Sequence, residues 1–93
     1  MLFDTEIMDF EQPENGKIKF VARIEDIMRG IVTIAHLELL ASKRTGVKKI
    51  DGVDRAISMW HVSKKIPAAA RHTLPEAACF SVAQKMANIL NDT

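Results

Sequence analysis

The sequence predicts a mainly α-helical fold of the α+β kind, in which an N-terminal β-hairpin is followed by a compact bundle of three to four helices. Polar and apolar residues alternate on both sides of a turn within residues 5–22, as they do in half-exposed strands. From Ile24 onward the apolar residues recur with helical spacing. The length of 93 residues is that of one domain, so we expect residues 1–93 to form a single domain.

The hairpin is expected to pair residues 5–11 with residues 17–22. Met8 and Phe10 lie on one side of the first strand, and the segment 13–16 (Pro-Glu-Asn-Gly) has the composition of a reverse turn. Two strands alone are marginally stable in water. The hairpin should therefore lie on helices or pair with a second copy of the chain.

Two middle helices are predicted, over residues 24–43 and 52–64. The apolar positions of the first fall within one helical arc, although the β-branched segment 31–34 would also suit a strand. Gly46 follows the first helix as a stop signal, and Asp51 is a candidate N-cap for the second. The inward stripe of the second helix consists of Val53, Ala56, Ile57 and Trp60.

Two further helices are predicted toward the C-terminus, a short one over 67–72 and a long one over 74–91. Pro67 suits the first position of a helix, and Thr73 and Glu76 have the spacing of a capping box. The apolar face of the last helix is broad, which indicates more than one neighbour; a dimer partner is one way to cover it.

The net charge of +1 is distributed unevenly along the chain. Residues 1–42 carry a net charge of −4, residues 43–72 carry +6, and residues 73–93 carry −1. A basic block of this kind favours nucleic acid or an acidic partner if the fold gathers its charges on one face. The alternative interpretation is a solvated surface that binds nothing.

Catalysis and cofactor binding are not indicated. Cys79 is the only cysteine, the three histidines lack the spacing of metal ligands, and the four glycines are scattered rather than grouped in a phosphate-binding loop. We therefore expect no enzyme activity, no metal and no cofactor. The N-terminus lacks the features of a signal peptide and no apolar run is long enough to cross a membrane, so a cytoplasmic protein is expected.

The segment 52–67 contains Ala56-Ile57-Ser58, then Trp60, then a basic stretch and Ile66-Pro67. It resembles the recognition-helix region of Cro-like helix-turn-helix phage regulators, and the resemblance covers about residues 52–71. That resemblance implies a dimeric transcriptional regulator that binds double-stranded DNA in the major groove. The residues that it and the basic block assign to DNA are Lys48, Lys49, Asp54, Arg55, Ser58, Lys64 and Lys65.

Two functions remain open from the sequence. The first is a sequence-specific DNA-binding regulator, in which Arg55 contacts a base edge and the lysines contact phosphates. The second is a small protein-binding module, such as a phage or mobile-element inhibitor or adaptor of a host protein, without nucleic-acid activity. In either case Trp60 is most simply explained as a core residue.

Overall fold

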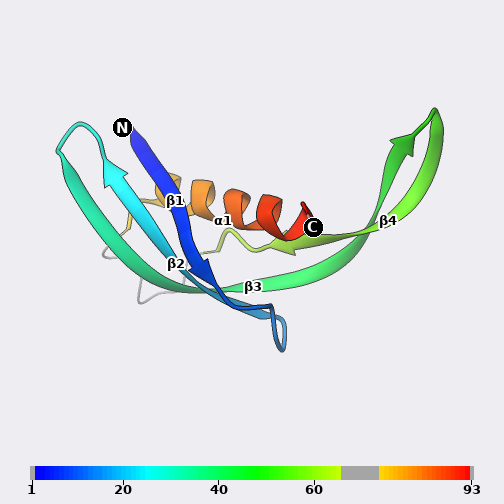
Figure 1. Cartoon of the computed structure of the whole chain (residues 1–93), viewed down its shortest axis with the longest axis horizontal. Coiled ribbons are helices and arrows are strands. Elements are labelled where there is room, and N and C mark those ends of the chain that lie inside the picture. The colour runs from blue at the N-terminus through cyan, green and yellow to red at the C-terminus, as the bar shows by residue number, and fades with distance from the viewer. Residues whose placement is uncertain (1, 66–73, 93) are drawn as a thin grey trace.

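The computed structural model describes residues 2–65 and 74–92, which form four antiparallel strands followed by one helix (Figure 1). The elements are β1 (Phe3–Phe10), β2 (Lys17–Asp26), β3 (Ile31–Ile50), β4 (Val53–Val62) and α1 (Glu76–Asn91). The fold is thus mainly β. The predicted bundle of three to four helices is wrong.

The strands form one curled sheet in the order β1-β2-β3-β4, in which every neighbour pair is antiparallel. β3 is 20 residues long and has two partners, since its first half (31–40) pairs with β2 and its second half (41–50) pairs with β4. The register is continuous along both halves. A bulge at Met8 interrupts the pairing of β1 with β2.

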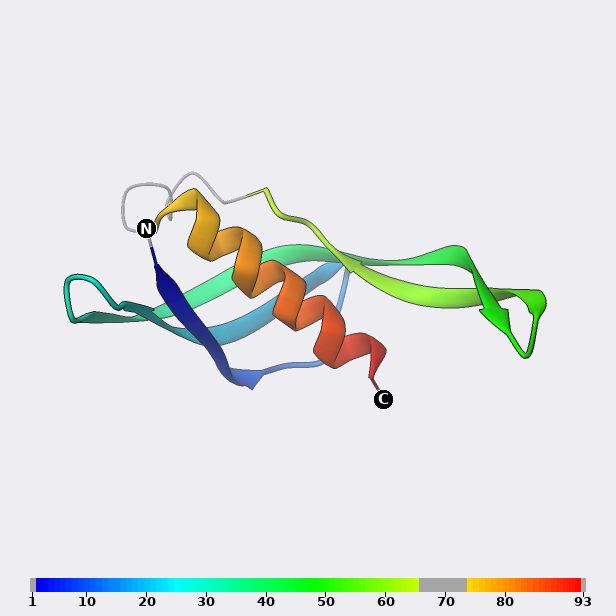
Figure 2. The same cartoon turned by 90° about the horizontal axis from the view of Figure 1, so that it is seen from above.

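Helix α1 lies across the concave side of the sheet, as the two perpendicular views show (Figures 1 and 2). Every second residue of β2 from Ile18 to Ile24 and of β3 from Ala35 to Ala41 points toward it and is buried, whereas the residues between them point away. We call the side that carries α1 the helix face and the opposite side the outer face. The core residues are Ile18, Phe20, Ala22 and Ile24 of β2, Ala35, Leu37, Leu39 and Ala41 of β3, Val62 of β4, Leu74, and Ala78, Cys79, Val82, Ala83, Met86 and Leu90 of α1.

Beyond the buried pair Ala41 and Val62, β3 and β4 continue as a two-stranded ribbon that leaves the rest of the molecule (Figure 2). We call this ribbon, residues 42–61, the arm, and the remainder the body. The arm turns at Asp51-Gly52, whose φ angles of 53° and 77° are both in the left-handed region. This is the backbone of a tight hairpin turn of type I′, for which Asp-Gly is a preferred pair.

The prediction of the N-terminal hairpin is confirmed. β1 pairs with β2 around Asn15-Gly16, where Glu14 and Lys17 exchange both backbone hydrogen bonds, at 2.9 and 3.0 Å. The last helix is also confirmed, since α1 occupies most of the predicted range 74–91. Helix 67–72 lies outside the described residues. The capping box is wrong, because Glu76 is the first residue of α1, Pro75 is its N-cap and no side chain of the described residues caps the helix.

The two middle helices are wrong. Residues 24–43 contain the end of β2, the turn around Gly30 and the first part of β3, and residues 53–62 form strand β4. Helical spacing and strand alternation coincide over Ile24 to Ile34, but the β-branched segment 31–34 and the regular burial of alternate residues from Ala35 to Ala41 belong to a strand. Asp51 is therefore a turn residue and not an N-cap, and the described chain has no recognition helix between residues 52 and 64.

Candidate nucleic-acid interface

The arm concentrates positive charge on a ribbon that is almost entirely exposed. It carries five basic residues, Lys43, Arg44, Lys48, Lys49 and Arg55, and only two acidic ones, Asp51 and Asp54. Since the rest of the molecule lies to one side of it, both faces of the ribbon face solvent over most of its length (Figures 1 and 2).

Strand alternation divides these charges between the two faces. Ala41 and Val62 point to the helix face, so Lys43 and Lys49 share that face, whereas Arg44, Lys48 and Arg55 point to the outer face. Lys48 lies directly opposite Arg55 in the register, close to the turn at the tip. The outer face of the tip therefore presents two cations side by side.

None of the arm's cations forms an ion pair in the described part of the chain. The salt bridges found there are Lys17–Glu38, Arg23–Glu25 and Arg29–Asp26, and all of them belong to the body. Like charges directly opposite each other in an antiparallel pair destabilise it. The pair Lys48–Arg55 is thus unfavourable in the free protein, and an anion bound across it would relieve the repulsion.

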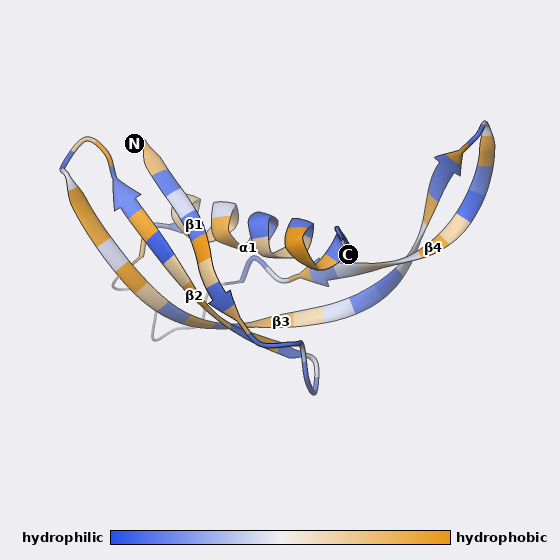
Figure 3. Cartoon of the chain, in the orientation of Figure 1, coloured by the Kyte–Doolittle hydropathy of each residue, from blue (hydrophilic) through white to orange (hydrophobic). Residues whose placement is uncertain are grey.

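Apolar residues are interspersed with hydrophilic ones along the arm, as the hydropathy colouring shows (Figure 3). Val47 is 74% exposed, Val53 is 56% exposed and Met59 is 42% exposed. A two-stranded ribbon with exposed apolar and cationic side chains and no third strand or helix over it buries little surface of its own. Its composition therefore suits a surface that becomes covered by a partner.

The root of the arm is attached to the C-terminal end of α1. The Asn91 side-chain amide accepts a hydrogen bond from the Trp60 backbone N–H at 2.7 Å and donates one to the Trp60 carbonyl oxygen at 3.0 Å. On the opposite strand, Lys43 places its Nζ 5.2 Å from the centre of the Trp60 ring. A hollow of about 220 Å³ lies beside this contact, between β4, Lys64 and the last two turns of α1.

The structure brings together some of the predicted DNA-contacting residues and separates others. Lys48, Lys49, Asp54 and Arg55 meet at the tip, where Lys48 is opposite Arg55 and Lys49 is opposite Asp54. Ser58 is on the helix face in the middle of the arm. Lys64 and Lys65 follow β4 at its other end, about nine residues or ~30 Å from Arg55 along an extended chain.

The prediction did not include Lys43 and Arg44 among the candidate DNA contacts. Both stand at the end of the helix predicted over 24–43, whereas residues 42–50 belong to strand β3. The signal that could have placed them on the ribbon is Asp51-Gly52 between two segments of strand-forming residues, which is typical of a hairpin.

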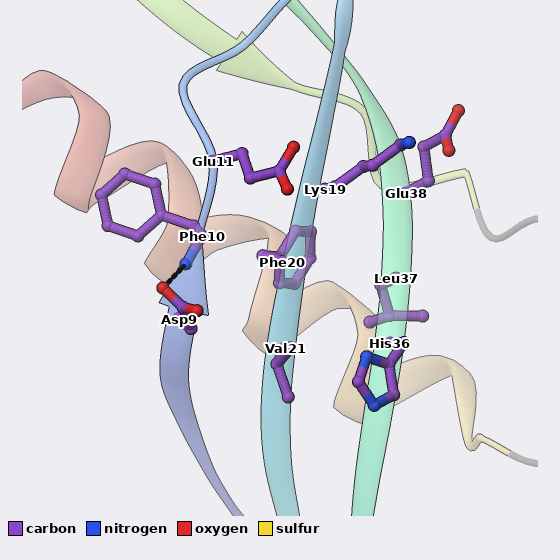
Figure 4. A pocket seen from close by; sticks show the side chains of 9 residues that line it. All are labelled: Asp9, Phe10, Glu11, Lys19, Phe20, Val21, His36, Leu37 and Glu38. Carbon is purple, nitrogen blue, oxygen red and sulfur yellow. Dashed lines mark hydrogen bonds between the residues drawn. The ribbon is translucent and has the colours of Figure 1, made fainter.

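In the part of the body that the structure describes, we find no comparable site. A shallow hollow of about 310 Å³ lies beside the β1 bulge, where Asp9, Glu11 and Glu38 are interspersed with Lys19 and His36 (Figure 4). Among the described residues no group of three or more His, Cys, Asp or Glu side chains is arranged to hold a metal ion. Burial raises the pKa of the Cys79 thiol, which keeps it in the unreactive protonated form.

No protein-family model matches the sequence, and comparisons with curated proteins and with solved structures likewise gave no match. Within the described residues, α1 is too short and too polar to cross a membrane. The functional interpretation therefore depends on the arm itself.

Proposed function

We propose that the protein binds DNA through the arm, as small transcriptional regulators with a β-ribbon do. A two-stranded antiparallel ribbon fits the major groove of B-DNA, and several DNA-binding proteins read the groove with strands instead of a helix. In this arrangement Lys48 and Arg55 at the tip bind phosphate groups together. Lys43, Arg44 and Lys49 neutralise phosphates on either side of the groove.

The observation that carries this proposal is the unneutralised cationic pair Lys48 and Arg55 on an exposed ribbon. A structural role gives no reason to place two cations opposite each other without an acidic neighbour on the same face. A polyanion gives one, because phosphate groups bound to both side chains replace repulsion with attraction and release counterions.

Salt dependence of binding to a labelled DNA duplex of about 20 base pairs tests the proposal, with fluorescence anisotropy as the readout. The slope of log K against log salt is about −0.9 for each phosphate contacted on B-DNA. Replacing Lys48, Lys49 and Arg55 together by Gln should weaken binding and reduce the magnitude of the slope by about 2.7.

The matched control removes the same charge from the body, by replacing Lys17, Lys19 and Arg29 by Gln, and should leave the slope near that of the wild type. Absence of binding by the wild-type protein at low salt would rule out DNA as the ligand. Equal loss in both triple variants would mean that the net charge, and not the arm, governs binding.

A protein-binding module is the second candidate, favoured by the outer face of the body. Val32 and Ile34 are exposed next to each other on the outer face of β3, away from α1, and Leu40 is exposed on the same face beyond His36 and Glu38. Exposed apolar surface of this kind is typical of contacts between proteins. Replacing Ile34 by Lys should abolish such a contact and leave DNA binding unchanged, which separates the two functions.

A further inference from the structure

We infer that Asn91 is the positioning residue of the arm, which fixes the direction in which the ribbon leaves the body and so prepares it for DNA. This inference rests on the proposed function. It assigns a task to a residue at the far end of the chain, 36 positions after Arg55 in the sequence and outside the basic block.

The geometry of Asn91 is that of a substitute strand. Its amide satisfies both the N–H and the carbonyl oxygen of one residue, Trp60, as the backbone of a neighbouring strand would. Because both Trp60 groups point to Asn91, they lie on the edge of β4 that faces away from β3. In the described structure this pair of hydrogen bonds, which we call the clamp, thus covers the open edge of β4 at the Lys43–Trp60 pair, the second pair of the arm.

The helix end that carries Asn91 is anchored to the body, so the Asn91 side chain starts from a fixed position. Asn91 is the last residue of α1, the N–H of Asp92 donates to the carbonyl oxygen of Ile89, and Leu90 is buried in the core. A short side chain on an anchored helix end has little freedom to follow the arm. The arm must instead adopt the direction that keeps both hydrogen bonds.

The arm itself has few other contacts that define its direction. At its root the Trp60 ring packs partly against the core, and the Lys43 ammonium lies over that ring. Farther out, from Arg44 to Met59, the described structure gives the ribbon only its own cross-strand pairs. A two-stranded ribbon of this length twists and bends easily at its root.

A fixed direction matters for binding because ordering a mobile element on the ligand reduces affinity. If Asn91 holds the arm in place before DNA arrives, loss of the clamp should lower affinity without removing any contact to DNA. The number of phosphates neutralised, and hence the salt slope, should stay the same.

The experiment compares Asn91→Ala, Asn91→Asp and the control Asn88→Ala. Asn88 lies one turn earlier on the same helix and hydrogen-bonds within it, to Gln84, so its loss does not touch β4. Asp retains an acceptor for the Trp60 N–H but turns a second carboxylate oxygen toward the Trp60 carbonyl oxygen in place of the donor, so it should weaken the attachment at least as much as Ala. Asn91 is exposed, so none of these changes should prevent folding.

Two readouts are measured, namely amide hydrogen exchange at Trp60 in the free protein and the salt-dependent anisotropy titration with duplex DNA. For Asn91→Ala we expect exchange at Trp60 to accelerate on the order of tenfold, and affinity to fall roughly threefold to tenfold at every salt concentration. The slope should be unchanged. Asn88→Ala should match the wild type in both measurements.

Unchanged exchange at Trp60 in Asn91→Ala would overturn the clamp. Faster exchange with unchanged affinity would overturn its role in binding, and a reduced slope would show that Asn91 acts on the DNA contacts themselves. If the wild-type protein binds no DNA, the proposed function fails and the task assigned to Asn91 in DNA binding fails with it, while the exchange measurement still decides whether Asn91 holds the arm.

Discussion

Reversing the charge of Arg55 should make the arm more stable and make the protein a poorer DNA binder at the same time. In Arg55→Glu the repulsive pair with Lys48 becomes an attractive one on the outer face. Cross-strand pairs contribute roughly 0.2–1 kcal/mol, with the opposite sign for like charges. The reversal should therefore stabilise the ribbon by about 0.5–1 kcal/mol.

The added stability should be detected in the arm and not in the unfolding of the whole molecule, because an exposed ribbon opens locally. Amide hydrogen exchange of the arm residues is accordingly the assay, and 0.5–1 kcal/mol corresponds to exchange that is roughly twofold to fivefold slower. DNA affinity should fall, with a loss of about 0.9 in the magnitude of the salt slope for the phosphate contact removed.

Arg44→Glu is the matched control, since Arg44 lies on the same face but opposite the neutral Met59. It should lose DNA affinity in the same way without slowing exchange. Faster or unchanged exchange in Arg55→Glu relative to Arg44→Glu would refute the idea that the tip is electrostatically unfavourable in the free protein.

Two further predictions concern the body. Met86 is fully buried between α1 and the sheet, so Met86→Ala should lower the free energy of unfolding by about 2–5 kcal/mol in urea denaturation, whereas Met59→Ala in the arm should change it by less than about 0.5 kcal/mol. Similar effects of the two substitutions would contradict the burial pattern. Burial raises the pKa of Cys79 above its ordinary value of 9.0, so the folded protein keeps the thiol proton after the unfolded chain has lost it. The contribution of the protonated thiol to the free energy of unfolding is complete below pH 9.0 and declines as the pH rises through the folded pKa. The midpoint of urea denaturation should show this decline in the wild type and not in Cys79→Ala.

The N-terminal hairpin and the last helix could be predicted because local signals and the tertiary fold agree there. Asn15-Gly16 adopts positive φ angles of 55° and 74°, as the turn chemistry of this pair indicates. The apolar face of α1 packs on the sheet as a helical stripe should. In the hairpin the apolar residues recur with the two-residue period of a strand, and in α1 they recur with the 3.6-residue period of a helix, so only one assignment fits each segment.

The middle of the chain was misread because two periods fit the same residues. Between Ile24 and Ile34 the apolar positions satisfy a helical arc, and only the alternation from Ala35 onward requires a strand. Gly46, the predicted helix stop, lies within β3 opposite Ile57, and an added Cβ there would be 3.6 Å from the Met59 sulfur, an ordinary contact. Asp51-Gly52 repeats the turn chemistry of Asn15-Gly16 and was the strongest available sign of a hairpin.

The candidate site was predicted in part. The basic block could be recognised from charge alone, and of its members Lys48, Lys49 and Arg55 do meet at the tip. The separation of Lys64 and Lys65 from that tip could not be predicted from charge, because it depends on how the chain continues past Trp60 at the end of β4. The contribution of Asn91 had no local signal, since it arises from a contact 31 residues away in sequence.

The division of β3 between two partners makes the length of the hairpin independent of the core. Its buried side chains end at Ala41, which faces Val62, and Trp60 is the arm residue that packs against the core, so removing equal, even numbers of residues from each strand beyond the Lys43–Trp60 pair shortens the projection without creating a cavity. Reach toward a distant ligand can thus change through paired insertions or deletions, while the packing that keeps the protein folded stays as it is.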